Sequence, residues 1–146
     1  MFDALIGNKD RHFYNWGVIY DLNQNKMPRF SPVFDTARGV FWNDAEDKLI
    51  RVLEDAKTTD NFIAGYIKKS IPKTGWDGEV KINHIELVQY LRIHYKPLTI
   101  RAESLFEEKH IEGIKRLLKD EFTPLLTVER LQLIEKCLVS RFQLIR

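Results

Sequence analysis

The segment GNKDRHFYNWGVIYD, residues 7–21, places polar side chains directly before an apolar, strand-like run. The polar side chains are Asp10, His12 and Asn15, and the run is residues 17–20. Residues 29–34, with the sequence RFSPVF, have a similar strand-like composition and follow a polar turn. This pattern predicts a small antiparallel hairpin with the polar side chains at its base.

The spacing of this hairpin predicts a cation site. A turn centred near Asn25 would place Tyr20 opposite residues 29–30 and Asn15 opposite Asp35. Paired residues in an antiparallel ladder have α-carbons about 4.5 to 5.5 Å apart, so one oxygen from each side chain can reach a common ion. Magnesium prefers hard oxygen ligands and keeps water or phosphate oxygens at its other positions. A register slip of one residue would point one of these side chains away.

Asp10, Asn15 and Asp35 also have the spacing used in phosphoryl transfer. In protein kinases a catalytic aspartate is followed by an asparagine with four residues between them, and a second aspartate further along binds magnesium. Asp10 and Asn15 have that separation, and Asp35 follows. The alternative is that these residues belong to ordinary turns, with Asp35 making a local side-chain bond.

The DRHFYN segment, residues 10–15, and the SPVFDTA segment, residues 31–37, together resemble the HipA-like serine/threonine kinases. These are bacterial toxin-type enzymes whose catalytic loop reads D-x-H-x-x-N. The D-R-H-x-x-N form also resembles the related phosphatidylinositol kinases. The resemblance implies that Asp10 is the catalytic base, that Asn15 and Asp35 hold Mg²⁺, that ATP is the phosphoryl donor, and that the substrate is a serine or threonine of a protein.

Two further residues of the DRHFYN segment have open roles. His12 joins Asp10 in the expected catalytic set, and its expected contribution is to brace the loop by a hydrogen bond to a backbone carbonyl or to Asp35. Arg11 either contacts phosphate or is solvated. Some HipA-like enzymes act on aminoacyl-tRNA synthetases and are held by a DNA-binding antitoxin, and the sequence leaves both partners open.

The rest of the chain has helical periodicity. Five helices are expected, and their starts are marked by Asn43 with Glu46, Thr59 or Asp60, Asn83 with Glu86, Ser104 with Glu107, and Thr127. Residues 70–78 should form an exposed loop because they contain one proline and two glycines. The expected fold is mainly α with a small β-hairpin and a bundle of about five helices. By resemblance it is a kinase carboxy-terminal lobe: a single unit over residues 1–146, with the site at 7–39 and a helical subdomain at 43–146.

Two parts of a working kinase do not occur in this sequence. It contains neither a G-x-G-x-x-G loop nor a V-A-I-K-like strand, and residues 1–6 look like the last turns of a helix. We therefore expect the amino-terminal lobe to be absent and to be supplied in cis or in trans. The chain alone should be inactive, and Phe13, Trp16 and Phe41 should be exposed where a partner would cover them.

Composition limits the other possibilities. The chain has 146 residues, 44% of them hydrophobic, which suits one core. Its net charge is +2 without a run of like charge, so we expect no direct nucleic-acid partner and no membrane contact. The single cysteine, Cys137, is expected to be buried and unreactive, and the expected compartment is the cytoplasm. The dispersed residues His84, His94 and His110 do not have zinc-ligand spacing.

Two alternatives to a protein kinase stay open. One is a noncatalytic interaction module that keeps a kinase-like motif as scaffold. The other is a lipid kinase, for which Lys68, Lys69 and Lys73 are the only basic cluster; we interpret that cluster as a solvated helix end. Arg38 can contact a peptide substrate or the other lobe, whereas Trp42 is expected to pack.

Overall fold

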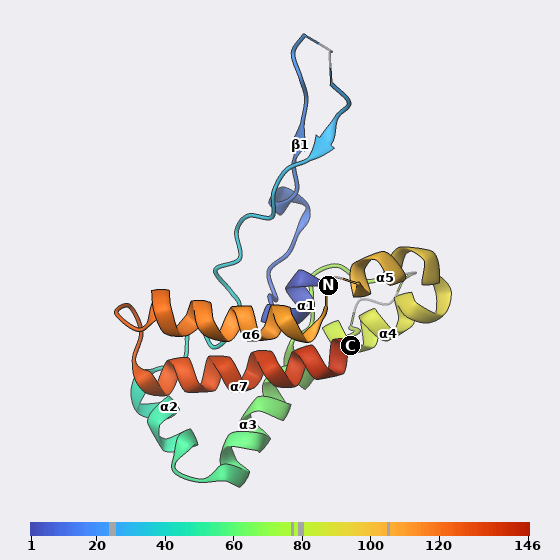
Figure 1. The fold of residues 1–146 in the computed structure, drawn as a ribbon. Helices are drawn as coiled ribbons and strands as arrows, with labels where there is room; N and C mark the ends of the chain where they lie inside the picture. Colours follow the sequence, from blue (N-terminus) through green and yellow to red (C-terminus); the bar gives the residue numbers. More distant parts are fainter. Residues whose placement is uncertain (24–25, 77, 79–80, 105) are drawn as a thin grey trace.

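The computed structural model describes residues 1–23, 26–76, 78, 81–104 and 106–146. The described part is mainly helical with one small antiparallel sheet, as expected (Figure 1). Its α-helices are α1 (Phe2–Ile6), α2 (Glu46–Leu53), α3 (Ala56–Lys69), α4 (His84–His94), α5 (Lys96–Glu103), α6 (Glu108–Leu117) and α7 (Val128–Ile145). A 3-10 turn covers Phe13–Asn15, a π-helical turn covers Leu118–Phe122, and the strands are β1 (Val18–Ile19) and β2 (Arg29–Phe30).

Helix α7 is the centre of the helical body. It contacts α1, α2, α3, α4 and α6, and its inward residues Leu133, Cys137 and Ile145 are fully buried. The predicted start at Thr127 is confirmed, because the Thr127 hydroxyl accepts a hydrogen bond from the Arg130 amide at 3.2 Å. The expected burial of Cys137 is also confirmed, and burial raises the pKa of its thiol to about 12.

The capping box before α4 is present as predicted. Asn83 Oδ1 accepts hydrogen bonds from the amides of Ile85 and Glu86, each at 3.0 Å. In return, Glu86 Oε2 accepts one from the Asn83 amide at 3.0 Å. This reciprocal pair satisfies donors at the helix start from residues that are neighbours in sequence.

Two predicted helix starts are misplaced. Helix α2 begins after Ala45, which makes no side-chain cap. Its Glu46 accepts hydrogen bonds from the Thr127 hydroxyl at 2.6 Å and from Arg130 Nε at 2.5 Å, so it ties α2 to α7 instead of closing a box with Asn43. Helix α3 begins earlier than predicted, after Asp55, whose carboxylate accepts from the Thr58 amide at 2.7 Å.

The start predicted at Ser104 is also displaced. An additional helix, α5, was not expected and occupies the residues before it. Ser104 ends α5, and α6 begins after Glu107. Helix α5 carries Pro97 in its first turn, a position that tolerates proline because the amide has no partner there. The described part of residues 43–146 therefore has one helix more than the five starts predicted. Residues 1–6 contain α1, as their helix-like sequence suggested.

The segment at 70–78 is less exposed than predicted. Ser70 is fully buried, its hydroxyl donates to the Tyr66 carbonyl at 2.6 Å, and Pro72 is buried as well. Ile71, residues 73–75 and Gly78 are exposed, and Trp76 packs against Tyr95 with ring centroids 4.7 Å apart. The last part of the predicted loop includes Asp77, which lies outside the described residues.

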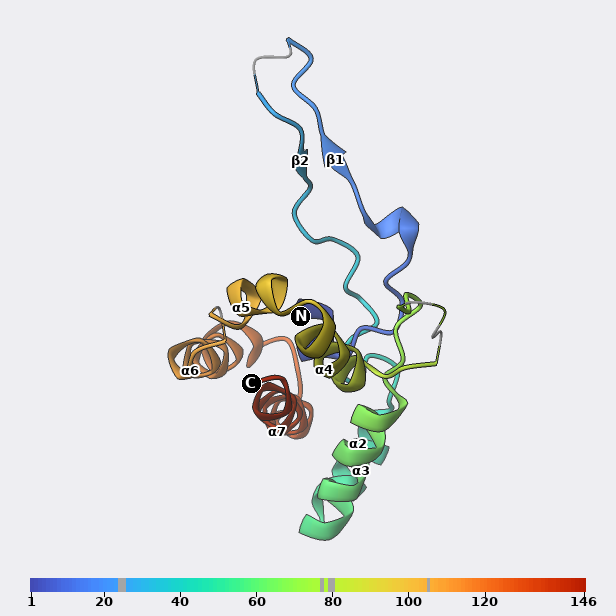
Figure 2. The same cartoon turned by 90° about the vertical axis from the view of Figure 1, so that its right-hand side faces the viewer.

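The hairpin projects away from the helical body, on the side opposite to α2 and α3 (Figures 1 and 2). Val18 pairs with Phe30 and Ile19 pairs with Arg29, so the register differs by one to two residues from the predicted one. The strands are also shorter than predicted, and the expected turn centre falls on residues outside the described part. In that described part, no helix is both long and apolar enough to cross a bilayer.

Candidate functional site

Gly7 sets the direction in which the chain leaves α1 and enters the DRHFYN loop. It ends α1 in the left-handed conformation, with φ 66° and ψ 34°. A β-carbon at this position would lie 2.7 Å from the ring of Tyr66, whose hydroxyl donates to the Ile6 and Gly7 carbonyls at 3.3 and 3.1 Å. Glycine is therefore required by both the backbone angle and the close approach of the ring.

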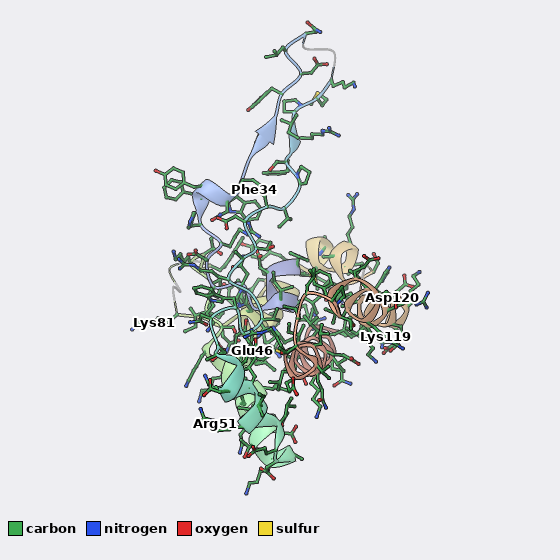
Figure 3. All side chains as sticks on the ribbon, turned by 90° about the vertical axis from the view of Figure 1, so that its left-hand side faces the viewer. Phe34, Glu46, Arg51, Lys81, Lys119 and Asp120 are labelled. Carbon is green, nitrogen blue, oxygen red and sulfur yellow. The ribbon has the colours of Figure 1, made fainter. Side chains whose placement is uncertain are left out.

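The side chain of Arg11 holds the DRHFYN loop in place through hydrogen bonds. Its Nε and Nη2 donate to the two carboxylate oxygens of Asp3, each at 2.8 Å, and its Nη1 donates to the Phe34 carbonyl at 2.5 Å and to the Asn15 carbonyl at 3.3 Å. Phe34 lies near the base of the hairpin (Figure 3). Arg11 is buried, so the alternative that it is solvated was wrong, and its nitrogens donate to groups of the protein. It joins α1, the loop and the return segment of the hairpin.

Asp10 lies next to Arg11 in the loop, and its carboxylate forms ion pairs with Lys73 and Arg38. Its amide donates to Asn8 Oδ1 at 3.1 Å, and Asn8 is itself fully buried. Lys73 forms an ion pair with one carboxylate oxygen, and Arg38 Nε lies 3.1 Å from the other. The hydrogen bond from Lys73, aided by the charge of Arg38, lowers the pKa of Asp10. Asp10 is thus a carboxylate at neutral pH.

Asn15 and Asp35 are in contact. Asn15 is 4% exposed, and its Nδ2 donates a short hydrogen bond to Asp35 Oδ2. Its Oδ1 accepts from the His12 amide at 3.1 Å. Asp35 has a left-handed backbone with φ 54°, a conformation that aspartate adopts more readily than most residues. The last backbone hydrogen bond of the ladder joins Ser31 to Gly17. Beyond it the chain is irregular, so the side chains of Asn15 and Asp35 can meet although the register differs from the predicted one.

His12 makes neither of the expected side-chain hydrogen bonds. Its ring lies edge-on to Phe13 and Tyr14, with centroids 6.4 and 6.0 Å away. Nδ1 is buried and has no hydrogen-bond partner among the described residues. What braces the loop here is the His12 backbone amide, through Asn15, and the guanidinium of Arg11.

The chemistry of the donors fits a magnesium ion under one condition. Asp35 offers a carboxylate, but Asn15 turns its nitrogen toward Asp35 and its oxygen toward the His12 amide. A half-turn of the Asn15 amide would place its oxygen beside Asp35. Among the residues described, no group of three or more histidine, cysteine or acidic side chains could hold a metal, so phosphate and water oxygens would complete the shell.

Lys73 and Asn8 were missed as site residues. Lys73 was grouped with Lys68 and Lys69 as a solvated helix end, yet it lies against Asp10. Asn8 precedes the motif and carries no recognisable spacing, so only its burial beneath Asp10 reveals it.

Arg38 and Trp42 also differ from their expected environments. Arg38 pairs with Asp10, and its guanidinium lies 5.4 Å from the centroid of the Trp42 ring. Trp42 was expected to pack, and it does so only in part: it remains about half exposed, with the Arg38 guanidinium over its ring. The indole therefore supports a residue of the candidate site.

Comparison of this chain with protein-family models, with curated proteins and with solved structures found no match. The candidate site is accordingly interpreted from its own geometry and from the resemblance carried by residues 10–15 and 31–37.

Proposed function

We propose that this chain is the catalytic carboxy-terminal lobe of an ATP- and magnesium-dependent HipA-like kinase that phosphorylates serine or threonine in a protein. The observation that carries the proposal is the direct contact between Asn15 and Asp35, together with an ionised Asp10 at the start of the same loop. Three oxygen-bearing side chains in a kinase-like order thus belong to one small frame fastened by Arg11.

In this proposal Asp10 receives a hydrogen bond from the hydroxyl group of the substrate and orients its oxygen toward the γ-phosphate. A carboxylate with a lowered pKa is a weak base, so orientation is its larger contribution. Lys73 and Arg38, which now pair with Asp10, would be free to contact phosphate oxygens when the substrate hydroxyl takes their place at the carboxylate. Asn15 and Asp35 would hold magnesium, which neutralises charge on the triphosphate.

A second lobe is part of the proposal. It would supply the phosphate-covering loop and the strand lysine, in cis or in trans. Support comes from the uncovered apolar side chains of the loop and hairpin: Phe13 is 73% exposed, Trp16 is 55% exposed and Phe30 is 76% exposed. Phe41 was wrongly expected among them. Its backbone has φ 58°, and its ring is fully buried against Phe62 and Tyr66.

A noncatalytic interaction module is the second candidate. The observation that favours it is that the polar groups of the site bind one another. Asp10 is neutralised by two cations, and Asn15 directs its nitrogen toward Asp35. In that case the same exposed hairpin would bind a protein, and the motif would only shape the loop. The lipid-kinase alternative loses Lys73 from its basic cluster, because that side chain contacts Asp10.

The test is a phosphorylation assay with radiolabelled ATP, on the chain alone and on the chain co-expressed with the residues encoded upstream of it. We expect activity in the second case, with losses of about 10² or more for Asp10→Ala and for Asp35→Ala. Asp47→Ala is the control, because Asp47 is an exposed carboxylate on α2 whose ion pair in the described part of the chain is with its helix neighbour Arg51. Full activity in either site variant would exclude that residue from the mechanism, and inactivity of the co-expressed wild type would favour the interaction module.

A further inference from the structure

A polar pocket lies beside α2 and α3, and neither Asn15 nor Asp35 lines it. Its volume is about 330 Å³, and it is lined by Lys9, Asn43, Asp44, Lys48, Asn61, Phe62, Gly65, Tyr66 and Lys69. Three of these residues are lysines and only one is acidic, so the lining carries two excess positive charges. Asp44 is already paired with Lys48. Lys9 and Lys69 have no carboxylate partner in the described part of the chain.

Two aromatic rings line this pocket, those of Phe62 and Tyr66. The Lys9 ammonium lies 5.0 Å from the centroid of the Tyr66 ring, and the Lys48 ammonium lies 5.1 Å from that of Phe62. Behind both rings is the buried ring of Phe41, with centroids 4.7 Å from Tyr66 and 5.0 Å from Phe62. Two of the cations are therefore placed by a packed aromatic cluster, and cation–π contacts hold them near the pocket.

Gly65 keeps the pocket open. It lies inside α3, where glycine is less favourable than alanine because it leaves the unfolded backbone more freedom. A β-carbon at this position would meet nothing within 4 Å, so packing does not require glycine. Because glycine has no side chain, the backbone of α3 borders the pocket directly at this position. A large side chain here would extend into the space between the lysines.

We propose that this pocket binds the phosphate monoester of a phosphorylated serine or threonine side chain. Such a group carries a charge near −2 at neutral pH and three acceptor oxygens, which matches two excess positive charges and the lysine donors. The amide groups of Asn43 and Asn61 add further donors. A carboxylate carries half this charge and one acceptor oxygen fewer, so it should bind more weakly. The proposal is independent of catalysis by Asp10.

The test is a titration of the isotope-labelled full chain with O-phospho-L-serine, followed by amide NMR at low salt and pH 7.5. We expect saturable shifts centred on Gly65 and Asn61, and weaker binding below the second pKa of the phosphate, near 6. Lys69→Gln should raise Kd about fivefold, as the loss of one exposed charge interaction does. Gly65→Leu should abolish binding by filling the pocket. Unlabelled L-serine should give no shifts.

Lys68→Gln is the matched control, because Lys68 is the exposed neighbour of Lys69 on α3 and does not line the pocket. Its Kd should be that of the wild type. Gly65→Ala should also bind normally and shows that the helix tolerates a side chain there. The proposal is overturned if Lys68→Gln weakens binding as much as Lys69→Gln, or if Gly65→Leu folds and binds normally.

A titration with inorganic phosphate distinguishes a phosphorylated side chain from free phosphate as the ligand. Tighter binding of phosphoserine supports a phosphorylated side chain as the ligand, whereas equal or tighter binding of inorganic phosphate overturns that assignment in favour of the free ion. Asp10→Ala should bind phosphoserine with unchanged Kd, so this result and the outcome of the kinase assay are distinguishable.

Discussion

His84 should make the stability of the fold depend on pH between about 6.5 and 4, a window that begins above the range in which carboxylates titrate. The residue is 3% exposed, and its Nδ1 lies 2.7 Å from the Ser70 carbonyl, which can only accept a hydrogen bond. The neutral ring therefore carries its proton on Nδ1. A second proton would go to Nε2, which is buried without a hydrogen-bond partner among the described residues. Burial, aided by the positive charge of Arg141, lowers the pKa of His84 from 6.5 to about 4.

The sign and size of the effect follow from proton linkage. Below pH 6.5 the unfolded chain binds a proton at His84 that the folded chain does not bind until about pH 4. Stability is therefore present in full above pH 6.5 and falls as the pH is lowered through that window. The slope is at most about 1.4 kcal/mol per pH unit, so the free energy of unfolding should fall by about 2 kcal/mol between pH 7 and pH 5.

The assay is urea denaturation at pH 7, 6 and 5 of the wild type, His84→Asn and His94→Asn. Asparagine at 84 cannot titrate but keeps a donor for the Ser70 carbonyl, and His94 is an exposed histidine on the same helix. We expect the wild type and His94→Asn to lose about 2 kcal/mol more than His84→Asn. All other groups contribute alike and cancel in this difference. Equal losses in all three proteins, or titration of the His84 ring between pH 7 and 5 in NMR, would refute the reasoning.

Two further substitutions test the frame beneath the candidate site. Gly7→Ala should destabilise the protein by about 2 to 4 kcal/mol in thermal or urea melts, because it adds left-handed strain to a steric clash; Gly113→Ala, with nothing within 4 Å of the new carbon, should not destabilise it. Arg11→Leu should cost about 2 to 3 kcal/mol, because it leaves the part-buried Asp3 carboxylate unpaired. Arg51→Leu breaks an exposed pair instead and should change stability by less than about 0.5 kcal/mol. A loss from Arg51→Leu as large as that from Arg11→Leu would contradict this assignment.

The difference between Arg11 and Arg51 explains why the sequence could not assign the buried arginine. Both follow an acidic residue within a few positions along the chain. Arg51 meets its aspartate one helical turn away and points into solvent (Figure 3). The partners of Arg11 come from α1, the loop and the far side of the hairpin, so its burial depends on segments meeting in three dimensions.

The sequence by itself determined the features that depend on near neighbours. The starts of α4 and α7, the largely helical character after residue 43 and the hairpin could be predicted because caps and periodicity act within one or two turns. The separation of Asp10 and Asn15 was equally visible.

Only the tertiary structure decided which distant groups share a surface. In the folded chain Glu46 binds Arg130 of α7 instead of capping its own helix, and Lys73 forms an ion pair with Asp10. The tertiary structure also joined Asn15 and Asp35 through an irregular segment where the predicted register does not hold. These contacts are set by the packing of α7 and by backbone angles at single residues, which local preferences along the chain do not specify.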